Sequence, residues 1–316
     1  MKVVVTGASG FIGSHVVDRL RAHGHEPRNF DLVPSPYDDQ VETVLGDLLS
    51  PNDARRGLDG CDAVIHLAAV ADVNHVVADP VHAEAMNSRG TAVVLEAARD
   101  LGTRVVYGST IWVYGDGLPG ETLDEDAALP LPKHLYTATK LAGEAYCRSY
   151  GELYDVEQTI LRFGIPYGPR ARGATVLAAF VAKARAGESL TLAGDGSQSR
   201  RFVYVEDLAH GIVAGLAPAA AGRIYNLVGD ESTTIREIAE TVQELVAPVE
   251  IVYVEGRAGD IRGAEISGRR ANDELGWRPQ TVFAEGARRY VDWVTATQGA
   301  PMAATASSID GRAATV

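Results

Sequence analysis

The chain has 316 residues, of which 46% are hydrophobic and 22% charged, and its formal net charge is -13. These values are ordinary for a globular protein long enough to bury a full core, as one large domain or two closely joined ones. The negative charge argues against a nucleic-acid partner or an anionic membrane surface, since both bind clustered positive charge. It does not exclude an anionic small molecule held by a local group of arginines.

Two cysteines, Cys61 and Cys147, occur without C-x-x-C spacing. This usage favours a reducing compartment, argues against a disulfide framework or a structural zinc site, and predicts two small buried side chains. The N-terminus lacks a charged leader followed by an apolar segment, and no apolar stretch reaches the ~20 residues that span a bilayer. We therefore expect a cytoplasmic protein with no metal and no membrane partner.

The first half of the chain alternates extended and helical patterns. Helical patterns begin at Phe11 and end before Gly24, run from about 80 to 101, and cover 135–150. Six strands are predicted, covering 2–6, a stretch that ends at 30–32, 41–47, 62–69, 103–109 and 158–163. Alternating strands and helices predict right-handed crossovers and a Rossmann-type doubly wound parallel α/β sheet.

The alternation breaks up after Phe163, where Pro166, Pro169 and Gly173 interrupt it. Helices and short strands then mix as far as Val294. We predict a sheet domain over 1–163 to which later segments return, and a smaller mixed α/β C-terminal lobe over 164–294 that binds substrate. Residues 295–316 are small and polar without periodicity, which predicts a disordered tail.

Three glycines, Gly7, Gly10 and Gly13, follow the first predicted strand and open the first helix. In that context backbone N–H groups and the helix dipole can hold a pyrophosphate, which predicts a dinucleotide site. Asp31 ends the second strand, where a carboxylate binds the hydroxyls of an adenosine ribose and repels a 2′-phosphate. NAD is therefore expected rather than NADP, although Arg28 is a counter-signal unless it is solvated.

These motifs together resemble the extended short-chain dehydrogenase/reductase family, and specifically its NAD-dependent nucleotide-sugar epimerases and dehydratases. The resemblance rests on the glycine spacing, Asp31, Asp47-Leu48, HLAA at 66–69 and YTATK at 136–140, and it extends from Met1 to about Trp293. It implies a cofactor site made of Gly7, Gly10, Phe11, Ile12, Gly13, Asp31, Asp47, Leu48, Leu67, Ala68, Ala69, Asn87, Tyr136 and Lys140. Two assignments have plainer alternatives: Asp47 reaches the adenine amino group or is a turn residue, and Asn87 lies near the nicotinamide half or caps a helix.

Tyr136 and Lys140 are four residues apart on a predicted helix, so they share a face. A phenol with a pKa near ~10 is a poor base at neutral pH, and a neighbouring ammonium together with a positive nicotinamide ring would favour the phenolate. The resemblance implies that Tyr136 exchanges the proton of a sugar hydroxyl while the cofactor takes the hydride. It assigns to Lys140 the nicotinamide ribose and the tuning of Tyr136.

The segment YGSTIWVYGD resembles the family's SSxxVYG and matches Thr110 to the hydroxyl that binds the reacting sugar hydroxyl. Ser109 points to the other face if the strand continues. In the sugar 4,6-dehydratases the next two positions are Asp and Glu, whereas here they are Ile111 and Trp112. Dehydration of that type is therefore not expected.

In the lobe, RFGIPYGPR resembles the family's RxFNVYGP with Ile165 in place of the usual Asn. The resemblance assigns Arg200, Arg257 and Asp260 to substrate binding, the two arginines on a diphosphate, whose oxygens suit guanidinium groups. Arg201 and Arg262 are expected to be solvated. A small residue, Ala264, falls where the family varies near the sugar 2-position, and Trp277 is expected to be structural.

These observations predict an NAD-dependent nucleotide-sugar 4-epimerase of the UDP-hexose type, acting through a transient 4-keto sugar and hydride return to the opposite face. The alternatives are an NAD(P)H-dependent 4-keto-sugar reductase or dehydrogenase and a non-catalytic NAD-sensing module. The resemblance also implies a homodimer through the helices near 80–101 and 135–151, with Ala142, Ala145 and Tyr146 as candidate contacts. The base, the sugar and the C6 substituent stay open.

Overall fold

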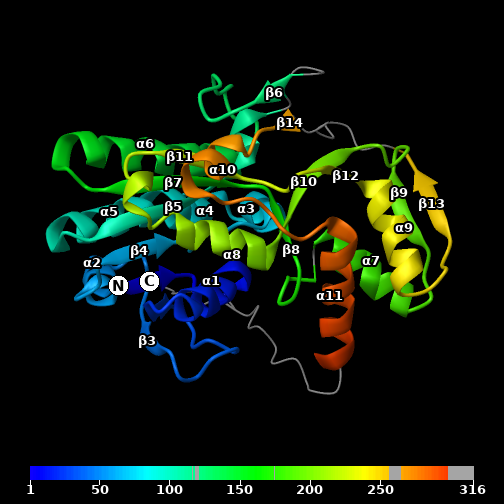
Figure 1. Ribbon diagram of the computed structural model, residues 1–316, viewed down its shortest axis with the longest axis horizontal. Helices are drawn as coiled ribbons and strands as arrows, with labels where there is room; N and C mark the ends of the chain where they lie inside the picture. The colour runs from blue at the N-terminus through cyan, green and yellow to red at the C-terminus, as the bar shows by residue number, and fades with distance from the viewer. Residues whose placement is uncertain (116, 118–120, 174, 256–264, 298–316) are drawn as a thin grey trace, which may run out of the picture.

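A seven-stranded parallel sheet forms the centre of the computed structural model, which describes residues 1–115, 117, 121–173, 175–255 and 265–297 (Figure 1). The strand order is β11-β7-β5-β4-β1-β2-β3. These strands are β1 (Lys2–Thr6), β2 (Glu26–Asp31), β3 (Glu42–Leu45), β4 (Ala63–His66), β5 (Arg104–Thr110), β7 (Gln158–Phe163) and β11 (Ile224–Leu227). The Rossmann-type fold is thereby confirmed. Strands β2 and β3 follow β1 on one side, and β4, β5, β7 and β11 follow it on the other, so the strand order reverses between β1 and β4. Open α/β sheets bind their ligands at such a point, at the carboxyl ends of the strands.

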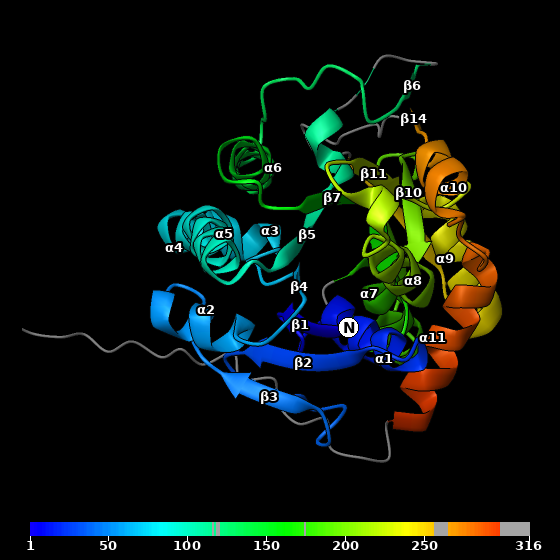
Figure 2. The ribbon, with the colours of Figure 1, turned by 60° about the vertical axis from the view of Figure 1, so that its left-hand side comes forward.

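Two layers of helices cover the sheet (Figure 2). Both faces of the sheet are apolar and need cover. In β1, for example, Val3 and Val5 pack into the core on one face and Val4 into the core on the opposite face. One face carries α1 (Phe11–Ala22), α8 (Val205–Ala214) and α10 (Arg269–Leu275), and the other α2 (Pro51–Leu58), α5 (Gly90–Leu101) and α6 (Leu135–Tyr154). Both cysteines are buried, as predicted.

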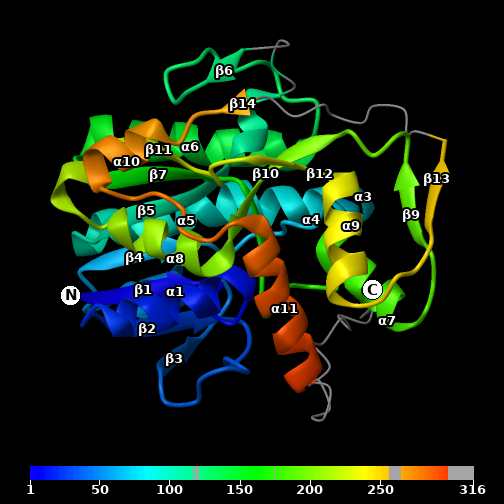
Figure 3. The same cartoon turned by 45° about the vertical axis from the view of Figure 1, so that its right-hand side comes forward.

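The lobe lies beside one end of the sheet and is built from small sheets and helices (Figure 3). Its strands are β8 (Ile165–Tyr167), β10 (Ser199–Tyr204) and β12 (Ser232–Thr234) in one sheet, and β9 (Leu190–Ala193) with β13 (Ile251–Val254) in another. A further pair joins β6 (Thr122–Leu123) to β14 (Glu265–Ile266). Its helices are α7 (Val176–Arg185), α9 (Ile235–Leu245) and α11 (Phe283–Thr297). The chain returns from this lobe to the large sheet, where α8, β11 and α10 complete the layers.

Several element boundaries differ from the predictions, among them the end of the strand predicted over 62–69, which is β4 at Ala63–His66. The third strand ends at Leu45 rather than Asp47, because the Asp47 carboxylate accepts the Leu49 N–H (2.8 Å) and closes a turn. The long helix near 80–101 is divided into α4 (Pro80–Glu84), a π-helical turn (Ala85–Arg89) and α5, preceded by α3 (Val73–Ala78). The last helix extends through Thr297 into the segment expected to be disordered, and residues 298–316 lie outside the described residues.

Other expectations concern single residues. Trp277 is buried and its indole N–H donates to the Asp207 carbonyl (2.9 Å), a structural role as predicted.

Of the side chains considered for a dimer contact, Ala145 and Tyr146 are exposed on α6 and Ala142 is partly covered. In the described part of the chain, no helix is both long and apolar enough to cross a membrane.

Candidate active site

A cavity of about 740 Å³ runs across the carboxyl ends of the central strands and on to the lobe. It begins at Asp31, the last residue of β2, passes the turn between β1 and α1, and reaches Tyr136 and Lys140 on α6. From the lobe it is lined by residues of β8, β10 and the start of α7. Predicted residues in its lining are Gly7, Gly10, Phe11, Ile12, Gly13, Asp31, Leu48, Leu67, Ala68, Ala69, Thr110, Tyr136, Lys140 and Ile165.

The glycine turn requires its glycines for two separate reasons. Gly7 has a φ of 70°, and a Cβ there would lie 2.9 Å from the backbone of Ala68 in the loop after β4. A Cβ at Gly13 would lie 2.2 Å from the Gly7 carbonyl oxygen. The turn and the first turn of α1 therefore pack backbone against backbone beside the cavity. This arrangement fits a pyrophosphate.

Asp31 is held at the far end of the cavity by the backbone. Its carboxylate accepts N–H groups from Ser9 (3.0 Å) and Leu32 (2.7 Å), which joins the glycine turn to the end of β2. Arg28, the counter-signal for a 2′-phosphate, is buried rather than solvated. It donates to the Glu42 carboxylate (2.9 Å) and to the carbonyl of Asp59 (2.6 Å), so it turns away from Asp31. The site thus fits a free ribose diol, as in NAD.

Asp47 and Asn87 do not reach the lining. The Asp47 carboxylate is exposed and closes its own turn, which is the plainer of its two interpretations. Asn87 is buried in the π-helical turn, where its carboxamide accepts the Val70 N–H (2.7 Å) and donates to the Val70 carbonyl (3.0 Å). Asn87 therefore stabilises the loop after β4 without lining the cavity.

Tyr136 and Lys140 lie one turn apart at the start of α6. The Lys140 ammonium donates to the Gly108 carbonyl (2.8 Å) in β5, and burial lowers its pKa to about 8. Burial raises the pKa of Tyr136 to about 12. Without a bound cofactor, burial therefore favours the neutral phenol. That Lys140 and a positive nicotinamide ring together favour the phenolate stays a prediction.

Residues of the turn after β5 face Tyr136. The Thr110 side chain lines the cavity and its hydroxyl oxygen accepts the Trp112 N–H (3.2 Å). The Trp112 ring stands edge-on to the Tyr136 ring, with ring centres 6.0 Å apart and an interplanar angle of 86°. Ser109 also lines the cavity, and its hydroxyl donates to the buried Glu144 carboxylate (2.6 Å).

Of the three lobe residues predicted to bind substrate, only Arg200 is among the described residues. Arg200 does not line the cavity and donates to the Ser199 carbonyl (2.8 Å). Arg201 is paired with Glu265 (2.6 Å) instead of being solvated. Arg257 and Asp260, like Arg262 and Ala264, lie outside the described residues.

Arg172, Thr175 and Phe202 line the lobe side of the cavity, and sequence reasoning missed them. Thr175 caps α7, where its hydroxyl oxygen accepts the Ala178 N–H (3.4 Å), and a threonine before a helical pattern is a signal that could have been used. Arg172 has no such signal, since it stands among small residues after the RFGIPYGPR motif.

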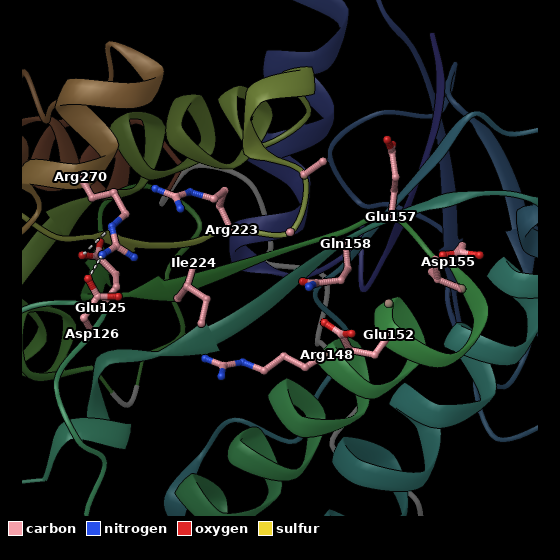
Figure 4. A pocket seen from close by; sticks show the side chains of 14 residues that line it. Glu125, Asp126, Arg148, Glu152, Asp155, Glu157, Gln158, Arg223, Ile224 and Arg270 are labelled. Atoms are coloured by element: carbon pink, nitrogen blue, oxygen red, sulfur yellow. Dashed lines mark hydrogen bonds and ion pairs between the residues drawn. The ribbon is translucent and has the colours of Figure 1, made fainter.

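A second cavity of about 700 Å³ lies between the end of α6 and the amino ends of β7 and β11 (Figure 4). Two of its arginines are already paired, Arg270 with Glu125 and Asp126, and Arg223 with Glu274. Its charged lining consists of Glu125, Asp126, Arg148, Glu152, Asp155, Glu157, Arg223 and Arg270. Carboxylates outnumber guanidinium groups there, so a diphosphate does not fit.

Comparison with known proteins agrees with this geometry. Residues 3–228 match the family described as "NAD dependent epimerase/dehydratase family". The chain is 34% identical to the UDP-glucose 4-epimerase of Mycolicibacterium smegmatis, over 93% of this chain and 98% of the relative. Decarboxylases of UDP-sugar acids from Bacillus cytotoxicus and Arabidopsis thaliana also match over similar spans.

Two solved structures are similar over nearly their whole length. The UDP-glucose 4-epimerase of Thermotoga maritima, solved with UDP-glucose, has a TM-score of 0.88 and 28% identity over 94% of this chain and 99% of its own. The UDP-glucose 4-epimerase of Thermus thermophilus, solved with NAD, has a TM-score of 0.85 and 34% identity over 93% and 99%.

Proposed function

Because this chain belongs to the NAD-dependent epimerase/dehydratase family, we propose that it is a nucleotide-sugar 4-epimerase of the UDP-hexose type. It is an enzyme of that family and its cofactor is NAD. Its substrate in this proposal is a nucleoside diphosphate sugar, the kind of ligand bound in the similar structure from Thermotoga maritima.

The observation that carries the proposal is the composition of the wall around Tyr136. Tyr136, Lys140 and Thr110 line one end of the cavity, as an exchange of the C4 hydroxyl proton requires. The two residues after Thr110 are Ile111 and Trp112, and the Trp112 ring packs on Tyr136. An indole and an alkyl chain offer neither an acid for a leaving hydroxyl nor a base for a neighbouring C–H. This supports epimerisation over dehydration.

The roles of the residues follow from their positions. Gly7, Gly10 and Gly13 would hold the pyrophosphate of NAD, and Asp31 its adenosine ribose. When bound, NAD supplies a hydride acceptor and donor at the substrate C4. Tyr136 removes the C4 hydroxyl proton and later returns it, Thr110 orients that hydroxyl, and Lys140 contributes positive charge beside them. Arg172 lines the lobe side of the cavity, where its guanidinium group would bind the diphosphate of the substrate.

The test uses the protein as purified, with no added cofactor. It is incubated with UDP-glucose, UDP-N-acetylglucosamine, UDP-glucuronate or dTDP-glucose, and products are identified by NMR and mass spectrometry. We expect one C4 epimer pair to interconvert. Tyr136→Phe should lower the rate roughly 10²–10⁴-fold. Tyr146→Phe, an exposed tyrosine of the same helix, is the matched control and should retain the rate.

Two other outcomes would overturn the epimerase assignment. Turnover of a 4-keto sugar only with stoichiometric oxidation of added NAD(P)H would identify the reductase alternative. Loss of CO₂ from UDP-glucuronate without an epimeric product would place the chain with its decarboxylase relatives.

A further inference from the structure

We propose that Thr139, acting with Asn87, is a positioning residue that fixes Tyr136 relative to the loop after β4 against which the cofactor would bind, residues 67–70, hereafter the floor loop. The proposal rests on the proposed function in one respect, that Tyr136 is the acid–base group. It assigns work to two buried side chains that line no part of the cavity.

Thr139 makes two hydrogen bonds whose directions are fixed. Its hydroxyl donates to the Tyr136 carbonyl (2.8 Å), and the same oxygen accepts from the Asn87 carboxamide nitrogen (3.0 Å). Both side chains are almost completely buried, with exposures of 3% and 1%. Water is therefore a poor substitute for either bond. The carbonyl that Thr139 binds belongs to the residue whose phenol does the proposed chemistry.

Asn87 carries this connection to the floor loop. Its carboxamide oxygen accepts the Val70 N–H (2.7 Å), and its nitrogen donates to the Val70 carbonyl (3.0 Å) as well as to Thr139. The orientation of the carboxamide is determined, since a flipped group would set its NH₂ against the Val70 N–H. Both amide protons and one oxygen lone pair are thus in use.

The other end of the floor loop is held by a second set of bonds. The Thr91 hydroxyl donates to the Asn87 carbonyl (2.7 Å), so toward His66 Nε2 (3.1 Å) it must accept, which places the imidazole proton on Nε2. His66 Nδ1 then accepts from the Thr6 hydroxyl (2.7 Å). The Thr6 oxygen in turn accepts the N–H groups of Leu67 and Ala68, each at 3.1 Å.

The π-helical turn explains why Asn87 can do this. A π turn adds one residue to a helix, redirects a side chain and recurs at functional sites. Here the Asn87 carboxamide reaches two separate segments from this turn, Val70 in the floor loop and Thr139 in α6. Proton and hydride transfer depend strongly on the separation of the reacting atoms. A rigid link between the floor loop and the Tyr136 turn would therefore fix the distance between the phenol and a cofactor bound against that loop.

The test compares Thr139→Val, which removes the hydroxyl and keeps the shape, with Thr139→Ser, which restores the hydroxyl. The first readout is single-turnover reduction of bound NAD by the nucleotide sugar, followed by absorbance. We expect Thr139→Val to slow it roughly tenfold, in line with the loss of a buried hydrogen bond, with KM within about twofold. Thr139→Ser should be close to wild type. Thr137→Val, an equally buried threonine of the same helix, is the matched control.

The second readout does not depend on catalysis. Amide hydrogen exchange at Val70 should be roughly tenfold faster in Thr139→Val than in wild type and unchanged in Thr139→Ser, because Asn87 loses one of its anchors. Unchanged exchange and an unchanged rate in Thr139→Val would overturn the proposal, as would a Thr139→Ser variant as slow as Thr139→Val. If none of the nucleotide sugars reduces the NAD bound to the wild-type protein, the proposed function has failed, and exchange at Val70 alone decides the inference.

Discussion

At the scale of single residues, burial sets the chemistry available before any ligand binds. Burial raises the pKa of Tyr136 to about 12 and lowers that of Lys140 to about 8. Burial favours the neutral form of each group. A positively charged cofactor ring in the same cavity would favour the phenolate of Tyr136 and so lower its pKa.

His66 gives a prediction on stability at acid pH. Burial lowers its pKa to about 3, from an ordinary value of 6.5 in the unfolded chain. Between these values the unfolded state binds more protons, so the contribution of neutral His66 is present above about pH 6.5 and is lost as the pH falls toward 3. Replacement by glutamine (His66→Gln) should reduce the slope of unfolding free energy against pH by up to about 1.4 kcal/mol per unit.

The free energy of unfolding is measured by urea denaturation at several pH values between about 5 and 7. The histidine of the unfolded chain is only partly protonated over this range, so the measured difference in slope is smaller than the maximum. His82→Gln, at an exposed position on α4, is the control and should keep the wild-type slope. An unchanged slope in His66→Gln would mean that the imidazole does not remain neutral in the folded protein.

At the scale of elements, the turn between β1 and α1 gives a second prediction. A Cβ at Gly13 would lie 2.2 Å from the Gly7 carbonyl oxygen, so Gly13→Ala must displace the turn. We expect the purified variant to lose most of its bound dinucleotide, measured by releasing and quantifying it after acid treatment.

Gly151→Ala in α6 is the matched control. Its added methyl would meet its nearest neighbour at 3.6 Å, an ordinary contact, and alanine favours a helix interior by roughly 0.5–1 kcal/mol. That variant should keep its dinucleotide. Full dinucleotide content in Gly13→Ala would show that the turn is not the pyrophosphate cradle.

The elements also show what could be predicted from sequence. The strand–turn–helix around Gly7 and the Tyr136–Lys140 pair could be recognised because their chemistry depends on spacing within one element. The link from Asn87 to Thr139 spans 52 residues and that from Thr6 to His66 spans 60, so only the packed fold brings them together. Asn87 was assigned to the nicotinamide half from the family resemblance, and the sequence gives no sign of the π turn from which its carboxamide binds Val70 and Thr139. Arg172 belongs to no pattern, and its place in the cavity comes from the docking of the lobe.

At the scale of the whole molecule, one buried ion pair joins the sheet to its helix layer. Arg162 in β7 binds Glu144 in α6 through two hydrogen bonds (3.0 and 2.7 Å), and it also donates to the Tyr114 hydroxyl (2.8 Å). Tyr114 in turn donates to Asn226 in β11 (2.9 Å). Removing one partner of such a pair leaves a buried charge unpaired and costs about 3–5 kcal/mol.

We therefore expect Arg162→Met to lower the free energy of unfolding by about 3–5 kcal/mol, measured by urea denaturation. The comparison is Arg269→Met, which breaks the exposed pair of Arg269 and Asp273 and should change it by less than about 1 kcal/mol. Similar effects of the two substitutions would show that the Arg162 pair does not hold the layers together.

The position of β11 at the sheet edge has a consequence for synthesis of the chain. Its neighbour is β7, yet residues 164–223, which include β8, β9 and β10, separate the two in sequence. While that stretch is being translated, the outer edge of β7 presents unpaired backbone groups, and such an edge is a template for pairing with other chains. Co-translational aggregation should thus be most severe for ribosomes paused before Ile224, and chaperone demand should fall once residues 224–227 have emerged and closed the edge.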